Sequence, residues 1–487
     1  MQEKTLEEEY SDYLSSLPLQ TLRTLGRRLG ISAESRKSKP GCIQALIDLL
    51  TGKALPVPVS GKGAPVKHNY LDPSILRHLE DLRLERNKRN TTPPNTFTVC
   101  APDPPKNLYE EPVYTGILEI MSGGYGFLRA KNCQPSANGA GDVFIAAPLI
   151  HSLKLREGDR VACTAKPSLK NESAAFQELL SVNGIPFGEC EPRPQFETLT
   201  ACYPEKRIPL SEKKGEFSLR VIDLFTPIGK GQRALVIAPP KAGKTTLLKE
   251  IAVSCARMRP DVHLIVLLID ERPEEVTEFK RCVSDAEVIY STFDEDAVHH
   301  TRAARLTIEH AKRYAEHGRD VVVLLDSLTR LTRAYNQVTE SSGKTLTGGL
   351  DAAAFAEPKR FFGAARNTAE AGSITIIASV LVETGSRMDD VIYEEFKGTG
   401  NCDIVLSREL SERRIFPAID LNRSGTRKEE LLLPREELEA TRLLREKHFT
   451  DNQTQLFDIL KKTKDNAEFA EKCKTALPYA KWTKETK

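Results

Sequence analysis

A strand followed directly by a phosphate-binding loop is the feature that most restricts how this chain can fold. Residues 233–237 read RALVI and residues 238–246 read APPKAGKTT. Such a loop needs backbone N–H groups that converge on a phosphate, a lysine that reaches the β- and γ-oxygens, and a hydroxyl group for Mg²⁺. The run from Gly243 to Thr245 supplies them at the start of a predicted helix. The first position mainly closes the turn, so Ala238 can replace the usual glycine if its φ is negative.

The loop predicts which residues contact the nucleotide, and two later strand ends predict the rest of the site. We expect ATP contacts from Pro240, Lys241, Ala242, Gly243, Lys244, Thr245 and Thr246. The strand VVVLLDS ends at Asp326, which is placed to hold Mg²⁺ together with Thr245, largely through water. The strand end LLIDERPEE brings Glu271 and Arg272 to the same edge of the sheet. Glu271 is the candidate base that orients the attacking water, although a plain strand-end carboxylate is the competing interpretation.

The hydrophobic pattern beyond residue 217 predicts a parallel sheet covered by helices on both faces. The buried-type strands RALVIA, VHLIVLLID, VVVLLDS and SITIIASVLV alternate with helical stretches. Between residues 113 and 187, short strands with period-two alternation and Gly, Asn and Pro punctuation predict a small barrel instead. The fold class expected is therefore multidomain α/β, with a barrel in front of a P-loop core.

Composition shifts give the expected domain boundaries. These are a helical subdomain at 1–51, a Pro/Gly-rich linker or insertion at 52–112, the barrel at 113–187, a connector at 188–216, the ATPase core at 217–435, its C-terminal helical part at 436–475 and a tail at 476–487.

Composition and cysteine spacing exclude several classes of protein. The 487-residue chain has a net charge of +2 and no apolar run that approaches membrane-spanning length, and its first residues, MQEKTLEEEYSDYL, are acidic. Neither a membrane span nor a secretory signal is expected, and the protein is predicted to be cytoplasmic. The ten cysteines contain no CxxC pair, so neither a disulfide framework nor a cysteine zinc site is expected. The adjacent His299 and His300 are interpreted as helix-surface residues.

Aromatic residues on two strands of the predicted barrel suggest a platform for unpaired bases. The motifs are YGFLRA, with Tyr125, Phe127 and Arg129, and DVFIA, with Asp142 and Phe144. Alternate aromatic side chains on one strand face stack with single-stranded nucleic acid. From alternation alone, each ring could equally be a core residue.

Motifs along most of residues 113–475 resemble the family of the bacterial transcription termination factor Rho. They are APPKAGKT, LLIDERPEEVTEF, SGKTLTGG, FFGAARN, VIYEEFKGTGN and IFPAIDLNRSGTRKEELL. The resemblance implies a RecA-like motor behind a cold-shock-like (OB-fold) barrel. It also implies a homohexameric, RNA-dependent ATPase that binds nascent single-stranded RNA, threads it through the ring and dislodges the RNA polymerase elongation complex.

The resemblance assigns further roles by motif position. Arg427 is implied as the arginine finger that acts on a neighbouring subunit, with Arg414 and Lys397 also reaching across the interface. Phe416 is implied to pack on the adenine, with a buried core phenylalanine as the alternative. Phe176 is expected to complete the aromatic platform, and Asp142 is expected to read a base.

The resemblance also implies two RNA-gripping loops inside the ring. The residues implied are Lys344, Thr347 and Gly348 in SSGKTLTGG, and Ser386 and Arg387 in ETGSRMDD. Without the family pattern, both loops would be ordinary surface turns. Two other functions stay open at this point: an RNA-binding protein that uses ATP without motor activity, and a rotary or export-type ATPase subunit.

Overall fold

The computed structural model describes two compact units of the chain, within Met1–Glu110 and Glu111–Lys487. The described residues are 6–28, 38–51, 113–130, 141–166, 173–212, 217–259, 261–284, 286–343, 345–447, 450 and 452–476. The whole predicted linker at 52–112 and the tail beyond residue 476 lie outside them, as does Lys344.

Three short helices form the described part of the first unit. They are α1 (Leu6–Ser16), α2 (Leu19–Arg28) and α3 (Lys39–Leu50). The core they enclose consists of Tyr10, Leu14, Leu22, Leu25, Cys42, Leu46 and Ile47. The hydroxyl of Ser38 accepts a hydrogen bond from the N–H of Gly41 at 3.2 Å, which fixes the start of α3. The small helical unit predicted from the leucine spacing is therefore present.

A closed five-stranded barrel begins the second unit, as predicted. Its strands are β1 (Val113–Ile120), β2 (Gly126–Arg129), β3 (Val143–Ile145), β4 (Arg160–Lys166) and β5 (Ala174–Val182), with the helix α5 (Ala147–Ser152) after β3 and the short β6 (Ile185–Pro186) extending β5. Parallel pairing of β3 with β5 closes the barrel. Leu118, Leu128 and Val161 lie in its core, as strand alternation requires.

A connector with little regular structure leads from the barrel to the motor domain. It contains the 3₁₀ turns η2 (Phe187–Glu189) and η3 (Phe196–Thr198) and the strand β7 (Ala201–Cys202), which pairs with β12 (Asn367–Thr368) of the motor domain.

A seven-stranded sheet organises the motor domain, with the spatial order β10-β9-β11-β13-β8-β14-β15. The strands are β8 (Arg233–Ala238), β9 (Val262–Glu271), β10 (Glu287–Thr292), β11 (Asp320–Asp326), β13 (Ile374–Leu381), β14 (Cys402–Val405) and β15 (Gly425–Thr426). All neighbours are parallel except β14 and β15, which are antiparallel.

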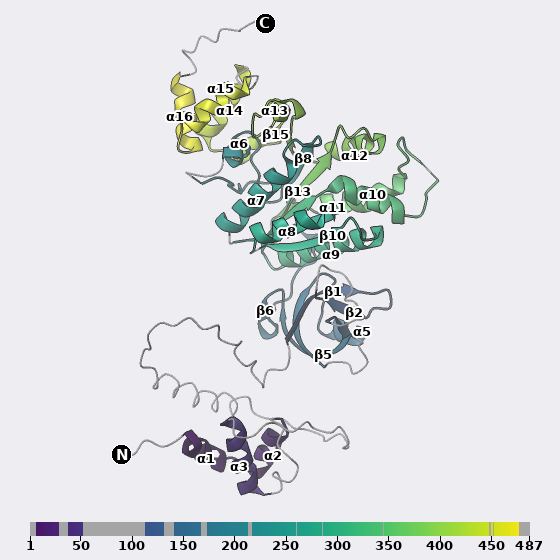
Figure 1. The fold of residues 1–487 in the computed structure, drawn as a ribbon, viewed down its shortest axis with the longest axis vertical. Coiled ribbons are helices and arrows are strands. Elements are labelled where there is room, and N and C mark those ends of the chain that lie inside the picture. The colour runs from purple at the N-terminus through teal and green to yellow at the C-terminus, as the bar shows by residue number, and fades with distance from the viewer. Residues whose placement is uncertain are drawn as a thin grey trace. The chain divides into compact units, whose positions relative to one another are not determined.

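Helices cover both faces of this sheet (Figure 1). The helices and 3₁₀ turns of the motor domain are α6 (Phe217–Phe225), α7 (Lys244–Met258), α8 (Pro273–Cys282), α9 (Ala297–Glu316), α10 (Leu328–Val338), η4 (Ala352–Phe355), α11 (Ala356–Gly363), α12 (Arg387–Lys397), α13 (Arg408–Glu412), η5 (Glu429–Leu431), α14 (Arg435–Glu446), α15 (Gln453–Lys461) and α16 (Asn466–Ala476). No helix in the described part of the chain is long and apolar enough to span a membrane.

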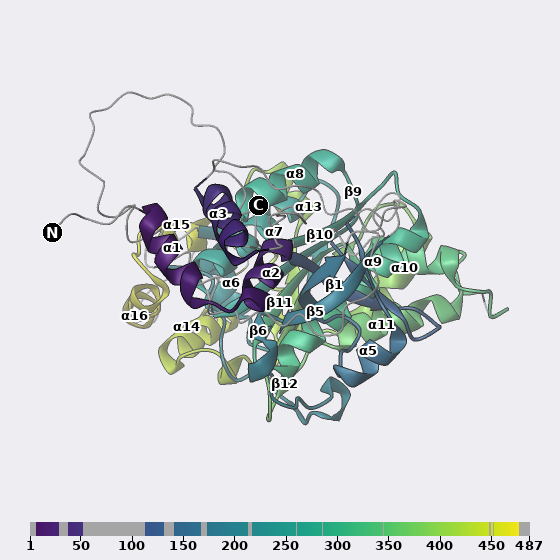
Figure 2. The ribbon, with the colours of Figure 1, turned by 90° about the horizontal axis from the view of Figure 1, so that it is seen from below.

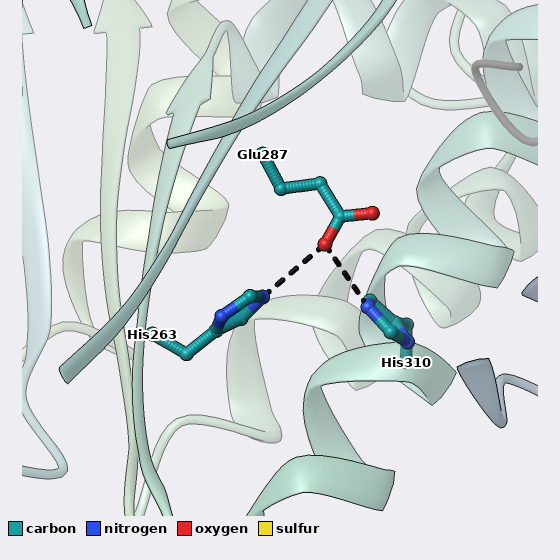
Figure 3. A group of neighbouring side chains, drawn as sticks. All are labelled: His263, Glu287 and His310. Carbon is teal, nitrogen blue, oxygen red and sulfur yellow. Dashed lines mark hydrogen bonds and ion pairs between the residues drawn. The ribbon is translucent and has the colours of Figure 1, made fainter. Parts of the chain in front are cut away.

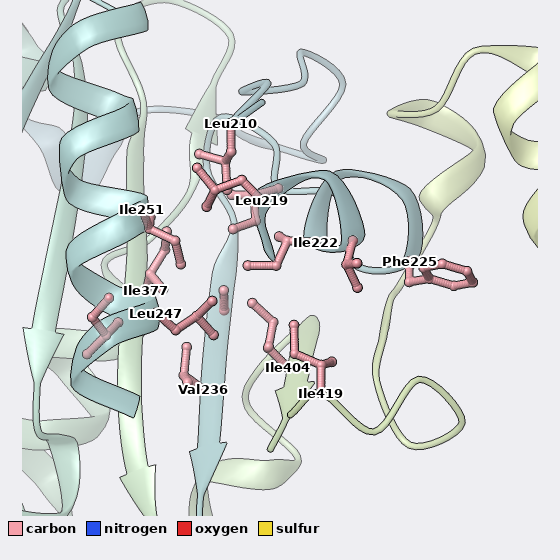
Figure 4. Packing of buried hydrophobic residues seen from close by; sticks show 14 of the residues in the cluster. Leu210, Leu219, Ile222, Phe225, Val236, Leu247, Ile251, Ile377, Ile404 and Ile419 are labelled. Carbon is pink, nitrogen blue, oxygen red and sulfur yellow. The ribbon is translucent and has the colours of Figure 1, made fainter. Parts of the chain in front are cut away.

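Alternate residues of the central strands supply two separate cores. In β8, Val236 faces a core with Leu247 and Ile251 of α7, which Figure 4 shows at close range. Its neighbours Leu235 and Ile237 face the opposite core. A strand buried on both faces reads as a continuous apolar run, which is why RALVIA shows no alternation in the sequence.

Helix α9 joins the barrel to the motor domain. It packs on β9 and β10 and also contacts β1 of the barrel, as both ribbon views show (Figures 1 and 2). The Nδ1–H of His310 donates to the carbonyl of Gly158 at 2.7 Å. The barrel residue Arg156 forms an ion pair with Glu316, at the end of α9, at 2.9 Å. Because α9 carries partners for both domains, their relative position is fixed by buried contacts.

His300 corrects the interpretation of the histidine pair as surface residues. Its ring is buried, and its Nδ1 lies 2.8 Å from the hydroxyl of Ser291, whereas His299 is half-buried and lies 3.6 Å from Glu295. Consecutive residues of a helix point about 100° apart, so one faces the sheet and the other faces solvent.

Gly158 allows the close approach of barrel and motor domain, and its substitution should loosen this junction. Gly158 has a φ of +87°, and a Cβ there would lie 2.4 Å from the Glu309 carbonyl carbon. Gly158→Ala should cost roughly 2–4 kcal/mol from backbone strain and overlap. Hydrogen exchange in α9 and in the loop before β4 measures the effect. Gly188→Ala is the matched control, because a Cβ at Gly188 meets nothing within 4 Å. Equal exchange in the two variants would contradict the expectation.

Candidate nucleotide and nucleic-acid sites

The phosphate-binding loop lies between β8 and α7, and its backbone has the conformation that the motif predicts. Gly243 is the N-cap of α7, with a left-handed φ of 90°, and Lys241 is also left-handed, at 64°. Ala238 is the last residue of β8, is buried, and is not among the residues with positive φ. Alanine is therefore compatible with the first position of this loop. The N–H groups at the start of α7 are available to a phosphate.

Lys244 and Asp326 meet across the sheet at the end of the loop. The Lys244 Nζ lies 2.5 Å from Asp326 Oδ1, which also accepts a hydrogen bond from Ser379 at 2.7 Å. The other oxygen, Asp326 Oδ2, is buried and has no hydrogen-bond partner among the described residues. The hydroxyl of Thr245 donates to Glu275 at 3.3 Å. A buried, unpartnered carboxylate oxygen near a hydroxyl group suits a hard cation such as Mg²⁺.

Glu271 ends β9 at the same edge of the sheet and is 3% exposed. Burial raises its pKa, and the negative charge of Asp326 raises it further, while Lys244 and Arg330 oppose the shift. The Arg330 Nη1 lies 2.9 Å from Glu271 Oε2 as an ion pair, and it donates to the carbonyl of Asp270. A buried carboxyl group with a raised pKa at a phosphate site is suited to proton transfer. Arg272 is exposed and is the N-cap of α8.

The sequence analysis missed Arg330 and Glu275. Arg330 lies in the first turn of α10, four residues after Asp326, and Glu275 lies in the first turn of α8. Both residues follow shortly after the strand ends that carry Asp326 and Glu271, and this position in the sequence could have identified them as candidates.

A cavity of about 300 Å³ adjoins the phosphate-binding loop. Ala242, Gly243 and Thr246 line one side of it, and Phe416 lines the other. Phe416 is 48% exposed, so it is not a buried core residue, and its ring is accessible to a planar base. Position and exposure therefore agree with the adenine contact that was expected.

Arg427 lies at the opposite edge of the sheet from the loop. It borders a second cavity together with Arg233, the first residue of β8, and its N–H donates to Asn401 at 2.8 Å. The loop follows the other end of β8, and six strand residues span about 20 Å. The positive charges of Arg427 and Lys397 both act on Asp403, so these two cations share that edge. Arg427 is therefore on the wrong side of its own sheet to reach its own phosphate loop.

Arg414 is separated from these two cations. It lies two residues before Phe416, is exposed and has a φ of 59°. The nearby hydroxyl of Ser411 donates to the carbonyl of Lys241 at 3.0 Å, which ties this segment to the phosphate loop of the same chain. The expected reach of Arg414 across the interface stays a prediction.

Tyr125, Phe127 and Phe144 form one aromatic cluster on the barrel. Their ring centroids lie 5.7 to 5.9 Å apart. Tyr125 is 38% and Phe144 is 37% exposed, so large apolar faces are open to solvent. The guanidinium of Arg129 lies 4.7 Å from the centre of the Phe127 ring. Tyr125 and Phe144 have the exposure that base stacking requires, and Phe127 is half-buried beside them.

Arg129 and Asp142 are buried beneath the cluster, which corrects the expectation that their side chains are free to read bases. Arg129 bonds Glu119 at 2.7 Å and Asp142 at 2.8 Å. Asp142 is 1% exposed. Because a buried arginine needs carboxylate partners, the pair supports the platform from below rather than presenting polar groups to RNA.

Phe176 is a core residue and does not complete the platform. It is 9% exposed and belongs to the barrel core. The strand register pairs Phe144 with Ala175, so the exposed face of β5 next to Phe144 carries Ala175. The next residue, Phe176, must point inward.

The two loops predicted to grip RNA lie against each other. Gly348 has a φ of +86°, and a Cβ there would lie 2.8 Å from the N atom of Met388. Met388 follows Ser386, the N-cap of α12, and the exposed Arg387. Thr347 is exposed in the first loop. Asp351, which the sequence analysis missed, anchors that loop by accepting hydrogen bonds from the hydroxyls of Ser341 and Ser342.

Two family models match separate parts of the chain. Residues 114–191 match the Rho termination factor RNA-binding domain family, and residues 218–426 match the nucleotide-binding domain of the ATP synthase alpha/beta family. A solved ATPase of a type III secretion system from pathogenic bacteria aligns with 62% of this chain and 94% of its own, at 25% identity and a TM-score of 0.48.

Curated relatives cover most of the chain at high identity. The transcription termination factor Rho of Bacillus subtilis is 51% identical over 358 residues, which are 73% of this chain and 83% of the relative. The Rho factor of Aquifex aeolicus is 53% identical over 364 residues, with the same coverage, and that of Escherichia coli is 50% identical over 369 residues, or 74% and 87%. The resemblance in the motifs is thereby confirmed, and the chain belongs to the transcription termination factor Rho family.

Proposed function

We propose that this protein is an RNA-dependent ATPase that captures single-stranded RNA on its barrel, threads it through a homohexameric ring and terminates transcription by dislodging RNA polymerase. The proposed ATPase activity rests on one observation: the side chains of Lys244, Asp326 and Glu271 lie together at the carboxyl edge of one parallel sheet. The relatives named as transcription termination factors support the biological role. Such a protein works in the cytoplasm, where transcripts emerge.

Hydrolysis of ATP requires the chain to orient water against the γ-phosphate and to stabilise the charge that develops. The N–H groups of the loop and the Lys244 ammonium bind the phosphates. Glu271, buried and with a raised pKa, is placed to accept the proton of the attacking water. Asp326 Oδ2, through water, and the Thr245 hydroxyl would hold Mg²⁺, which neutralises charge on the β- and γ-phosphates when it is bound.

Each catalytic pocket is completed by the neighbouring copy of the chain. Arg427 and Lys397 lie at the edge of the sheet opposite the phosphate loop. Stacking of identical subunits in a ring brings that edge of one chain against the carboxyl edge of the next. A guanidinium supplied in this way accelerates phosphoryl transfer by about 10³–10⁵-fold.

A series of contacts connects the predicted nucleotide site to the loops that are proposed to hold RNA. Helix α10 begins two residues after Asp326, with Ser327 as its N-cap. Its Arg333 forms a bidentate ion pair with Asp389 of α12, with Nη2 at 2.6 and 2.7 Å from the two carboxylate oxygens. Asp389 lies two residues after Arg387, at the channel loop. A shift of the Asp326 strand end on ATP binding is therefore transmitted to the RNA contacts through α10.

Two other functions compete with this proposal. A rotary or export-type ATPase shares the motor core but has no use for an exposed aromatic platform on a barrel. An RNA-binding protein that uses ATP only as a ligand has no use for Glu271 beside the phosphate site. The deciding experiment measures ATPase rates with and without single-stranded RNAs such as polycytidylate, together with the native mass. A monomer whose ATPase rate ignores RNA would refute the motor function.

Replacing the candidate base should separate binding from chemistry. Glu271→Gln removes the proton acceptor at nearly constant volume, so the ATPase rate should fall by about 10²–10⁴-fold while ATP still binds. Single-turnover hydrolysis and equilibrium binding of ATP measure the two effects. Glu274→Gln is the matched control on the exposed first turn of α8, and its rate should equal that of the wild type. Equal rates for both variants would remove Glu271 from catalysis.

Mixing experiments test the role of Arg427 in a neighbouring site. Arg427→Ala protein added to wild type should lower the ATPase rate more steeply than the wild-type fraction falls, since one altered chain disables its neighbour's pocket. Arg423→Ala changes an exposed arginine of the same segment and should cause no such inhibition. A strictly linear decline with Arg427→Ala would show that the arginine acts only within its own chain.

Two phenylalanine substitutions distinguish the RNA platform from the barrel core. Phe144→Ala should weaken binding of single-stranded RNA by about 1–3 kcal/mol, because a stacking face is lost, with little change in stability. Phe176→Ala should instead destabilise the barrel by roughly 3–5 kcal/mol through a core cavity. Fluorescence anisotropy with labelled oligonucleotides and urea unfolding measure the two quantities. A stable Phe176→Ala barrel with the same RNA defect would contradict the burial argument.

A further inference from the structure

The amino-terminal edge of the motor sheet carries a cluster of two histidines and a glutamate that the ATPase site does not use. His263 is the second residue of β9, Glu287 is the first residue of β10, and His310 lies in the middle of α9. Figure 3 shows both imidazole rings directed at one carboxylate oxygen. The His263 Nε2 lies 3.2 Å and the His310 Nε2 lies 3.1 Å from Glu287 Oε2. One potential ligand atom from each residue lies within 4.8 Å of the other two.

We propose that His263, Glu287 and His310 form a zinc-binding site at the junction of barrel and motor domain. Two imidazole nitrogens and one carboxylate oxygen are a ligand set that Zn²⁺ accepts, with a fourth position for water. This inference is independent of the proposed function, because the cluster lies at the opposite edge of the sheet from the phosphate loop.

The distances fit a tetrahedral ion. Zinc bonds of about 2.0–2.1 Å at tetrahedral angles place neighbouring ligand atoms about 3.3 Å apart. The two nitrogen-to-oxygen distances, 3.2 and 3.1 Å, already match. The third separation, between the nitrogens, is at most 4.8 Å and needs to shorten by no more than about 1.5 Å. Small rotations of the two imidazoles about their side-chain bonds supply that movement.

The hydrogen bond to Gly158 fixes His310 in a tautomer that suits a metal. The carbonyl of Gly158 can only accept, so the Nδ1 of His310, 2.7 Å away, carries a proton. The Nε2 of the same ring lies 3.1 Å from the Glu287 carboxylate and is the nitrogen left to bind a cation beside it. In zinc sites, a histidine usually binds the metal through one ring nitrogen and donates a hydrogen bond from the other, often to a backbone carbonyl.

Surrounding residues hold the rings in place and leave an approach open. The His263 ring stacks on Tyr314 with a centroid distance of 4.2 Å, and the His310 ring meets Tyr314 edge-on at 4.8 Å. Glu287 lines a cavity of about 460 Å³ between barrel and motor domain, through which an ion can enter and water can complete the coordination. Arg160 lies 3.4 Å from the same carboxylate oxygen, but it is 42% exposed and borders the cavity, so it has room to move aside.

A bound ion at this position would stabilise the junction. It would join the starts of two neighbouring strands to α9, and through the N–H of His310 to the Gly158 turn of the barrel. An ion that binds only the folded junction raises its resistance to unfolding.

Zinc binding by the full-length protein tests the site directly. The protein is stripped with a chelator, saturated with ZnCl₂ in the presence of excess ADP and Mg²⁺ to fill the phosphate site, and freed of unbound metal. We expect one retained zinc per chain by mass spectrometry of the metal, and a higher thermal midpoint with zinc than without it. His263→Gln and His310→Gln should each weaken zinc binding by at least about 100-fold in a competition titration. His151→Gln, an exposed histidine of the barrel, should bind as the wild type does.

Cobalt substitution identifies the ligands and excludes the cysteines. Co²⁺ bound by nitrogen and oxygen should give visible d–d absorption without a thiolate-to-cobalt band, and the absorption should disappear in His310→Gln. Three results would overturn the proposal: no zinc retained by wild type, equal retention by the two glutamine variants, or a thiolate band that persists in them. The thermal midpoints of the metal-free variants show whether the fold is preserved. Glu287→Gln removes the carboxylate ligand instead of a histidine and should weaken zinc binding in the same titration.

Discussion

The parallel direction of the motor strands is the constraint on which the rest of the structure depends. Because β8, β9, β11 and β13 run the same way, their carboxyl ends share one edge of the sheet and their amino ends share the other. Lys244, Asp326 and Glu271 meet at the first edge, although they are far apart in the sequence. Arg427 lies at the other edge, so under the proposed function it would complete the pocket of a second chain. Strand direction thus determines which side chains meet at the candidate catalytic edge.

Helix α9 extends this constraint to the barrel. It covers the sheet with one face and binds the barrel through Gly158, Glu157 and Glu119. The hydrogen bond to Gly158 is buried, and the ion pairs of Arg305 with Glu157 and Glu119 are partly exposed, so the geometry of these contacts must be satisfied on both sides. The aromatic cluster of the barrel is therefore held at a defined position on the motor domain.

Sequence patterns predicted those features that are encoded locally. The phosphate loop, Asp326 and Glu271 each follow a recognisable apolar strand, and the barrel rings follow a period of two. The errors arose where tertiary partners decide the outcome. Phe176 is inward because of its register with Ala165, and Asp142 is withdrawn because Arg129 needs a counter-ion.

Other features depend on packing between segments that are distant in the sequence. His263, Glu287 and His310 lie 24 and 23 residues apart along the chain, and only the sheet and α9 bring them together. Arg330 follows Asp326 closely, but its ion pair with Glu271 forms only because α10 packs beside the end of β9. No periodicity within one segment contains that information, because it depends on how separate segments pack.

The balance of charge at the catalytic edge explains how nucleotide binding can alter the chain. In this structure Lys244 is paired with Asp326, and Glu271 lies close enough to Asp326 for its pKa to be raised. When Lys244 turns toward a phosphate, Asp326 loses that partner, and two buried carboxylates face each other with Arg330 as the remaining cation beside Glu271. Such a pair is stable only with added positive charge or a relaxed position of the strand ends. Helix α10 begins two residues after Asp326, and its Arg333 pairs with Asp389 beside the loop that contains Arg387. In the proposed mechanism, relaxation of this strand end would therefore be transmitted through α10 to the loops that are proposed to hold RNA.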